Sequence, residues 1–244
     1  AVQLSKVLGG SKSSAPMNNG AVAIGTSSVD PYDLASSNST LSNQVYSNSS
    51  TGFGQYPAED AFDNIIDDHT ASWVSGDNSY DTDGTHDGTA NATAGYAGEW
   101  VQVDIGQDVI LKSFEIFPRH VTQTTSLSQH PKDMRLFSSD DGTNWTQLHD
   151  WTDLTLDDWR PSGTYGSLGP YTTNTTSRYF RLTINKTIGG EASAYTQIAE
   201  IRLKGFLPSE NSTTTSYPLD ASGVSVPALK SIYEQLMNVP GRSQ

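Results

Sequence analysis

The sequence predicts an all-β protein built as an antiparallel β-sandwich. Several runs of residues alternate apolar and polar side chains with a period of two, which is typical of strands buried on one face. Segments rich in Gly, Asp, Asn and Ser separate these runs, and Asp141-Gly142 is a hairpin-turn signal. No convincing helix lies between the runs, which favours an antiparallel sandwich. The runs are residues 100–105, 111–117, 134–137, 178–184 and 197–206.

The strand-like runs lie in the middle of the 244-residue chain, so we expect the sandwich domain at residues 41–206. Residues 1–40 are rich in Ser, Gly and Asn and predict an extended N-terminal arm. Residues 207–244 predict a polar linker and then a short amphipathic α-helix at 227–238, with Pro227 in its first turn. Because so short a helix is marginal alone, its apolar stripe should dock on the sandwich or on another subunit. The stripe is Leu229, Ile232, Tyr233, Leu236 and Met237.

The net charge of −13 argues against nucleic acid and anionic membrane surfaces as main partners. No apolar run approaches the ~20 residues of a membrane span, so we expect no membrane insertion. The chain has no cysteine, which excludes disulfides and thiol chemistry. Residues 57–108 contain twelve Asp or Glu and no Lys or Arg. This segment predicts either a solvated acidic face or carboxylates that are neutralised by a bound cation.

Five short motifs, in order along residues 41–206, resemble the discoidin family, also called the coagulation factor V/VIII C-type domain. The resemblance implies a discoidin-like jelly roll, a galactose-binding-like fold shared with many carbohydrate-binding modules. The family usually has Asp-Gly where this chain has Asp63-Asn64, and Asn also tolerates left-handed backbone. A short helix is expected just before this point, beginning at Pro57. The motifs are residues 57–64 with 70–73, 98–106, 139–145, 177–182 and 198–201.

The resemblance also implies a structural calcium ion beside the first loop, because related modules use an Asp there and the Glu of the last strand. In this sequence these residues are Asp63 and Glu200, and further candidate ligands are Asp67, Asp68 and Thr70. A flexible acidic loop can supply the six to eight oxygens that calcium takes. The alternative is a loop held by hydrogen bonds and caps alone. Residues 81–88 also resemble a calcium loop, but they lack an EF-hand's distal Glu, and we favour an ion-free excursion.

Ligand binding in this family uses loops at one end of the sandwich. Here the long loops are residues 77–98, 120–130 and 150–173, and the third is rich in aromatic residues. Exposed aromatic rings can stack on a sugar while Arg, His and Asn bind its hydroxyl groups. The alternative for each Trp is burial beneath the loop. The candidate ligand-binding residues are Arg119, His120, Trp151, Trp159, Arg160 and Tyr165.

Catalysis finds little support, because the common nucleophile, zinc-protease and phosphate-loop motifs are not found in the sequence. We therefore expect a non-enzymatic carbohydrate-binding or adhesion module, extracellular or on a virion surface, with glycans as partners. Residues 1–40 and 227–238 would bind protein partners in a larger assembly, and a homo-oligomer is compatible with them. The alternative is a structural decoration, capsid or tail protein that uses the same fold without binding sugar.

Overall fold

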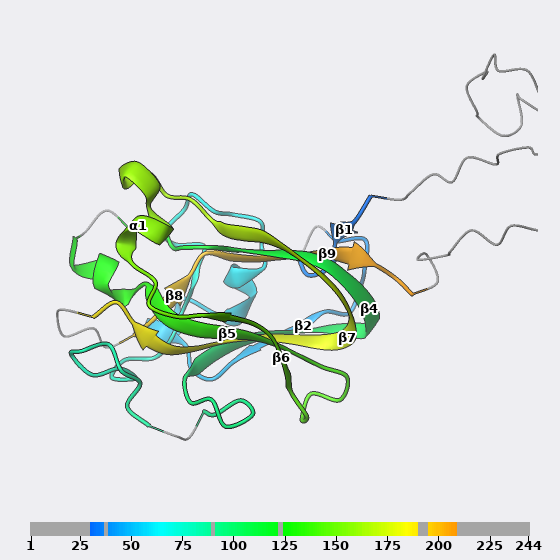
Figure 1. The fold of residues 1–244 in the computed structure, drawn as a ribbon, viewed down its shortest axis with the longest axis horizontal. Coiled ribbons are helices and arrows are strands. Elements are labelled where there is room, and N and C mark those ends of the chain that lie inside the picture. The colour runs from blue at the N-terminus through cyan, green and yellow to red at the C-terminus, as the bar shows by residue number, and fades with distance from the viewer. Residues whose placement is uncertain (1–29, 37–38, 89–90, 122–123, 190–194, 209–244) are drawn as a thin grey trace, which may run out of the picture. The chain divides into compact units, whose positions relative to one another are not determined.

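The computed structural model describes residues 30–36, 39–88, 91–121, 124–189 and 195–208, which fall in one compact unit at 30–211. They form an antiparallel β-structure with very little helix, which confirms the predicted fold class (Figure 1). Among these residues, no helix has the length and apolar character needed to cross a membrane. The strands are β1 (Tyr32–Asp33), β2 (Val45–Asn48), β3 (Trp73–Val74), β4 (Glu99–Phe117), β5 (Pro131–Ser139), β6 (Thr146–Trp151), β7 (Leu168–Thr187), β8 (Gln197–Ile198) and β9 (Glu200–Phe206).

Two long strands, β4 and β7, bend at one end of the domain and so contribute to both layers of the sandwich (Figure 1). The register shift at residues 104–109 of β4 makes this bend, and Gly106 there has a φ of 85°. Before the bend, β4 pairs with β2, and after it with β9. The later half of β7 pairs with β5, which pairs with β6, so β6 and the early half of β7 are free edges of the two layers.

The core lies between the two layers, and its residues follow the predicted alternation. In β4 the side chains of Val101, Val103 and Ile105 are fully buried, while the residues between them are partly exposed. The large core side chains include Phe62, Trp73, Trp159 and Phe180. The Asp141-Gly142 turn joins β5 to β6 as predicted, and Gly142 has the left-handed φ of 72° that such turns favour.

The structure moves the domain boundary predicted at residue 41 toward the N-terminus. Tyr32 and Asp33 form β1, which pairs with β9, and Leu34 is fully buried. Residues 30–36 are therefore part of the sandwich, because Leu34 fills the core and the Asp33 carboxylate accepts the backbone N–H groups of Ala35 and Ser36. Residues 1–29 and 37–38 of the predicted arm lie outside the described residues, as does the helix expected at 227–238.

The remaining elements are short helices in the connecting segments. The helix expected after Pro57 is the 3-10 turn η3 (Ala58–Ala61). The one α-helix among the described residues, α1 (Leu156–Trp159), begins with a capping box between Thr155 and Asp158. The other 3-10 turns are η2 (Gly52–Gly54), η4 (Thr124–Gln129) and η5 (Pro161–Gly163).

Candidate functional site

Two of the predicted ligand-binding residues, Trp151 and Trp159, are buried in the core, so the expectation that they stack on a ligand is wrong. Trp159 is 0% exposed and its indole N–H donates to the Pro131 carbonyl at 2.7 Å. Trp151 is 5% exposed and its indole N–H donates to the Tyr171 hydroxyl at 3.2 Å. Both rings close the sandwich beneath the 150–173 loop, as the alternative interpretation held.

His120, Arg160 and Tyr165 come together at the end of the sandwich where β4 stops. The His120 and Tyr165 ring centroids are 4.0 Å apart, and the Arg160 guanidinium lies 4.7 Å from the Tyr165 ring centroid. The Tyr165 hydroxyl is held by the backbone of Val121, at 2.8 Å from its carbonyl oxygen. His120 and Tyr165 also line a cavity of about 140 Å³ with Ile66, Phe117, Pro118, Gly166 and Ser167. Partial burial lowers the pKa of His120, which favours the neutral imidazole.

Arg119 joins this group to the first loop of the domain. Its Nε donates to the His69 carbonyl at 2.7 Å and its Nη1 to Gln197 Oε1 at 3.2 Å. Its guanidinium lies 4.5 Å from the Tyr56 ring centroid. Arg119 is only 7% exposed, so it fixes the relative positions of three segments and presents one edge of its guanidinium at most.

Phe53 is an exposed aromatic residue that the sequence analysis missed. Its side chain is 57% exposed, although its ring makes edge contacts with Tyr56 and Tyr195, at centroid distances of 6.4 and 5.6 Å. Its φ of 53° is left-handed, which is strained for a bulky residue and is a reason to suspect function. The sequence signal was there, because Phe53 stands alone between Gly52 and Gly54 in a polar loop. Phe53, Tyr56, Tyr195, Arg119, His120, Arg160 and Tyr165 are called the loop-end cluster below.

The two main predicted calcium ligands, Asp63 and Glu200, lie close enough to influence each other electrostatically. Glu200 is 1% exposed; its Oε2 accepts the Asn64 N–H at 3.0 Å, while its Oε1 is buried without a hydrogen-bond partner among the described residues. Burial, together with the charges of Asp63 and Asp33, raises the pKa of Glu200 to about 8. Burial, with Asp63 and Glu59 nearby, raises the pKa of Asp60 to about 6.

The predicted left-handed turn is present, because Asn64 has a φ of 66°. Its side chain also works as a junction that glycine could not provide. Asn64 Nδ2 donates to Asp33 Oδ2 at 3.0 Å, and its Oδ1 accepts from Arg202 Nε at 3.1 Å. The substitution thus fastens β1 and β9 to the first loop.

Among the described residues, Asp67 and Asp68 do not form a metal-binding group with Asp63 and Glu200, although the Asp68 charge, after burial, helps to raise the pKa of Asp63. Asp68 Oδ1 accepts both the backbone N–H and the hydroxyl of Thr70, at 2.8 and 2.7 Å. Asp67 is exposed and its charge acts on His120. Within the described part of the chain, no three His, Cys, Asp or Glu side chains converge in a way that could hold a metal. Any ion at Asp63 and Glu200 would need backbone carbonyls as its further ligands.

The acidic excursion at residues 81–88 is held by hydrogen bonds. Asp83 Oδ1 accepts the Thr85 N–H at 2.9 Å, and Gly84 packs against the backbone of Thr187. His86 reaches Glu99, whose Oε1 lies 3.4 Å from His86 Nε2 and accepts from Asn91 Nδ2 at 2.9 Å. The hydroxyls of Ser49 and Ser50, which directly follow β2, donate to Glu99 Oε2. Glu99 therefore connects the excursion, through His86, to the end of β2.

Comparison with solved structures finds carbohydrate-binding modules at low sequence identity. A family 32 carbohydrate-binding module from Clostridium perfringens NanJ, in complex with galactose, is 16% identical, with a TM-score of 0.46 over 72% of this chain and 99% of the module. A fucose-binding module from Streptococcus pneumoniae is 13% identical, with a TM-score of 0.47 over 72% of this chain and 96% of the module. None of the curated proteins compared matches this chain.

The decisive match is to a family model. The F5/8 type C domain model matches residues 44–201, which span the sandwich from β2 to the start of β9 and include Glu200 and all of the loop-end cluster. The match covers well over half of the 244 residues. The chain belongs to the F5/8 type C, or discoidin, domain family.

Proposed function

We propose that this protein is a non-enzymatic carbohydrate-binding module whose glycan site is the loop-end cluster. The observation that carries the proposal is the Phe53 ring, 57% exposed on a left-handed backbone and supported at its edges by Tyr56 and Tyr195. A ring held in this way offers a rigid stacking surface for the apolar face of a sugar. His120, Arg160 and the cavity beside Tyr165 supply polar groups for the sugar's hydroxyls.

We also propose that the module works outside a cell or on a virus particle, as part of a larger assembly. Family membership supports a displayed binding module. Attachment through residues 1–40 and 227–238, and assembly into a homo-oligomer, stay predictions, since residues 1–29 and 227–238 lie outside the described part of the chain.

A structural calcium ion between the first loop and β9 is the second part of the proposal. Its support is the buried, unpartnered Oε1 of Glu200 beside Asp63, since an unpaired buried oxygen is costly unless something binds it. Asp63, Glu200 and backbone carbonyls of the loop would hold the ion. Calcium would supply positive charge that stabilises the ionised carboxylates and fixes the loop. Asp67, Asp68 and Thr70 stay outside this ligand set.

The glycan proposal is tested by screening the full chain on a broad glycan array and titrating the best glycan against two variants. Phe53→Ala should weaken binding by about tenfold or more, because it removes the stacking surface. Val45→Ala is the matched control, since Val45 is 59% exposed but lies on β2, outside the cluster. Equal affinity of Phe53→Ala and wild type would remove the cluster as the site. Silence across the array would favour a structural protein that uses the fold without binding sugar.

A further inference from the structure

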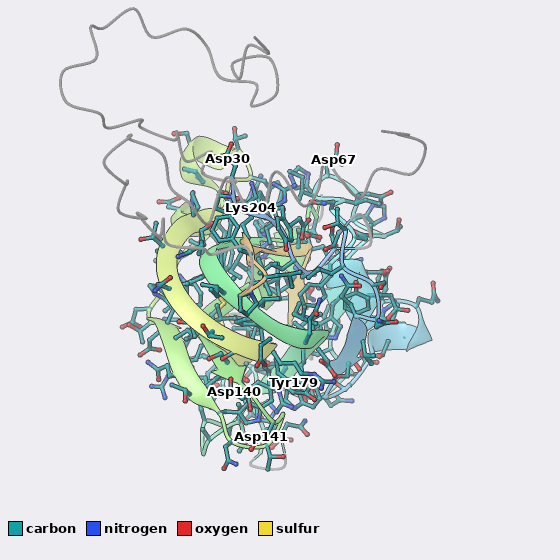
Figure 2. The ribbon with its side chains drawn as sticks, turned by 90° about the vertical axis from the view of Figure 1, so that its right-hand side faces the viewer. Asp30, Asp67, Asp140, Asp141, Tyr179 and Lys204 are labelled. Atoms are coloured by element: carbon teal, nitrogen blue, oxygen red, sulfur yellow. The ribbon has the colours of Figure 1, made fainter. Side chains whose placement is uncertain are left out.

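The end of the sandwich opposite the loop-end cluster contains a second cavity, of about 330 Å³. It opens between the hairpin that joins β5 to β6 and the bend of β7. The lining residues are 138–141, 144 and 146 of the hairpin and 175–177 of β7. Figure 2 views the molecule from this end and shows Asp140, Asp141 and Tyr179 together at the lower side of the domain. The volume is at the lower limit of small-molecule sites.

The cavity is lined by polar side chains, among them hydroxyls that have no partner among the described residues. Ser138 is 2% exposed and Ser177 is 4% exposed, yet neither hydroxyl makes a hydrogen bond to any of the described residues. Both belong to strands, so the fold holds their positions. Neither hydroxyl oxygen is one of the fully enclosed side-chain atoms that lack a partner among the described residues, so both are accessible from the cavity and can hydrogen-bond to a ligand there.

The carboxylates in the lining differ in availability. Asp141 is fully occupied, since its Oδ1 accepts the N–H groups of Thr143 and Asn144 at 2.8 and 2.7 Å and its Oδ2 accepts from Asn144 Nδ2 at 2.7 Å. Asp140 is exposed and makes no hydrogen bond or ion pair with the described residues. With respect to the described residues, the cavity thus offers one unpaired carboxylate, that of Asp140, beside four unpaired hydroxyls, those of Ser138, Thr146, Thr176 and Ser177.

We propose that this cavity binds one uncharged, hydroxyl-rich ring, such as a residue of a neutral glycan. Vicinal hydroxyl groups can donate to Asp140 and exchange hydrogen bonds with Ser138, Thr146, Thr176 and Ser177. An anion would meet the charges of Asp140 and Asp141, and an apolar molecule would leave the hydroxyls unpaired. The lining has no aromatic side chain, so binding here is weaker than stacking would give.

A second saccharide site at this end would make the domain bivalent. A glycan chain could bridge two domains, and two weak sites on one polymer bind far more tightly than either alone. The second site does not involve the loop-end cluster. In the Phe53→Ala variant, therefore, binding at the cavity can be measured without binding at the loop-end cluster.

The test uses amide chemical shifts of the full chain carrying Phe53→Ala, titrated with glucose, glucosamine or glucuronate up to roughly 100 mM, well above a millimolar Kd. Glucose should shift the amides of residues 138–146 and 175–177 in a saturable way, and glucuronate should not. Saturable shifts with glucosamine alone would mean an amine site, and no shifts with glucose would mean no site; either result overturns the proposal.

Two substitutions show whether the lining makes the contacts. Thr176→Val should weaken glucose binding by about three- to tenfold, because it removes one hydroxyl at nearly constant volume. Thr172→Val is the matched control, since Thr172 is also exposed on β7 but lies outside the cavity. Asp140→Asn should weaken binding as well, and both variants are at exposed positions where folding should survive. Equal affinity in Thr176→Val, Asp140→Asn and Thr172→Val would contradict the site.

Discussion

Two buried glutamates of this domain have opposite environments. Glu99 is 3% exposed and Glu200 is 1% exposed, so both have lost their water. Four side chains hydrogen-bond to the Glu99 carboxylate, and they lower its pKa to about 2 despite burial. Burial and the charges of Asp63 and Asp33 raise the pKa of Glu200 to about 8, and the single backbone N–H that it accepts, from Asn64, is too little to offset them. The two glutamates are similarly buried, and they differ in the number of donors and in the neighbouring carboxylates around each carboxylate.

Glu99 is a structural charge whose hydrogen-bond partners are all present, whereas Glu200 is a carboxyl group that still lacks one among the described residues. The Glu99 network, with His86, Asn91, Ser49 and Ser50, is complete and ties the 77–98 excursion to β2 and β4. The Glu200 environment is incomplete, because Oε1 has no hydrogen-bond partner in the part of the chain that the structure describes. In the folded protein without a cation, Glu200 avoids an unpaired buried charge by keeping its proton at neutral pH.

The largest expected effect is the loss of the Glu99 network. Glu99→Gln should lower the free energy of unfolding by about 3 kcal/mol, because it removes the charge that His86 and the two serines surround. Glu115→Gln is the control, since Glu115 lies on the same strand, is partly exposed and accepts one hydrogen bond, from Ser167. Urea unfolding measures both variants. A cost for Glu99→Gln no larger than that of Glu115→Gln would remove the distinction drawn above.

The next effect concerns calcium at Glu200. At a calcium concentration of 100 Kd, the wild-type chain should gain about 2.7 kcal/mol, or roughly 5–10 °C in Tm. Glu200→Gln should abolish this gain, while Asp67→Asn should retain it, because Asp67 lies by His120. Thermal unfolding with calcium and with chelator measures each gain. An unchanged wild-type Tm on chelation would exclude a structural calcium ion.

A smaller effect is the pH dependence of calcium binding. Because the pKa of Glu200 is about 8 in the folded protein, a cation must displace its proton at neutral pH. Calcium affinity should therefore rise by up to about tenfold per pH unit below pH 8 and then level off. Titration calorimetry at several pH values measures the slope. A flat profile between pH 6 and 8 would mean that Glu200 is not a ligand.

The smallest effect is the stability of the calcium-free protein. The folded pKa of Glu200 lies above the unfolded value of 4.5, so the folded state holds the proton longer. The free energy of unfolding should thus fall as the pH rises from about 4.5 to about 8. Asp60, raised from 3.8 to about 6, adds a fall at the acidic end of that window. Glu200→Gln should flatten the fall in the free energy of unfolding above pH 6. Denaturant unfolding at several pH values, with chelator present, measures this fall.

The strands could be predicted from the sequence because their information is local. The alternation in residues 100–105 reports which side faces the core, and Val101, Val103 and Ile105 are buried accordingly. β1 could not be found in this way, because its two residues have no periodicity and depend on pairing with β9. The site could not be predicted from local patterns either. Asp63 and Glu200 are far apart in the sequence, and only the family resemblance predicted that they lie close together.

The aromatic residues show most clearly why the site was only half predictable. Trp151 and Trp159 are the largest aromatics of their loop, and size alone cannot say which side of the loop faces the core. The sequence did not mark Phe53 as a ligand-binding residue, although its two flanking glycines allow an exposed position with a left-handed backbone. The contacts show that His120, Arg160 and Tyr165 meet at one end of the sandwich, and their role in ligand binding stays a prediction.

The most direct test of the proposed function is where a bound glycan sits. Amide chemical shifts should be mapped on the full chain with the best glycan from the array. The largest changes should fall at residues 52–56, 119–121, 165–167 and 195, around Phe53, Arg119, His120 and Tyr165. Saturable changes confined to other surfaces, with these amides unmoved, would contradict the assignment of the loop-end cluster as the glycan site.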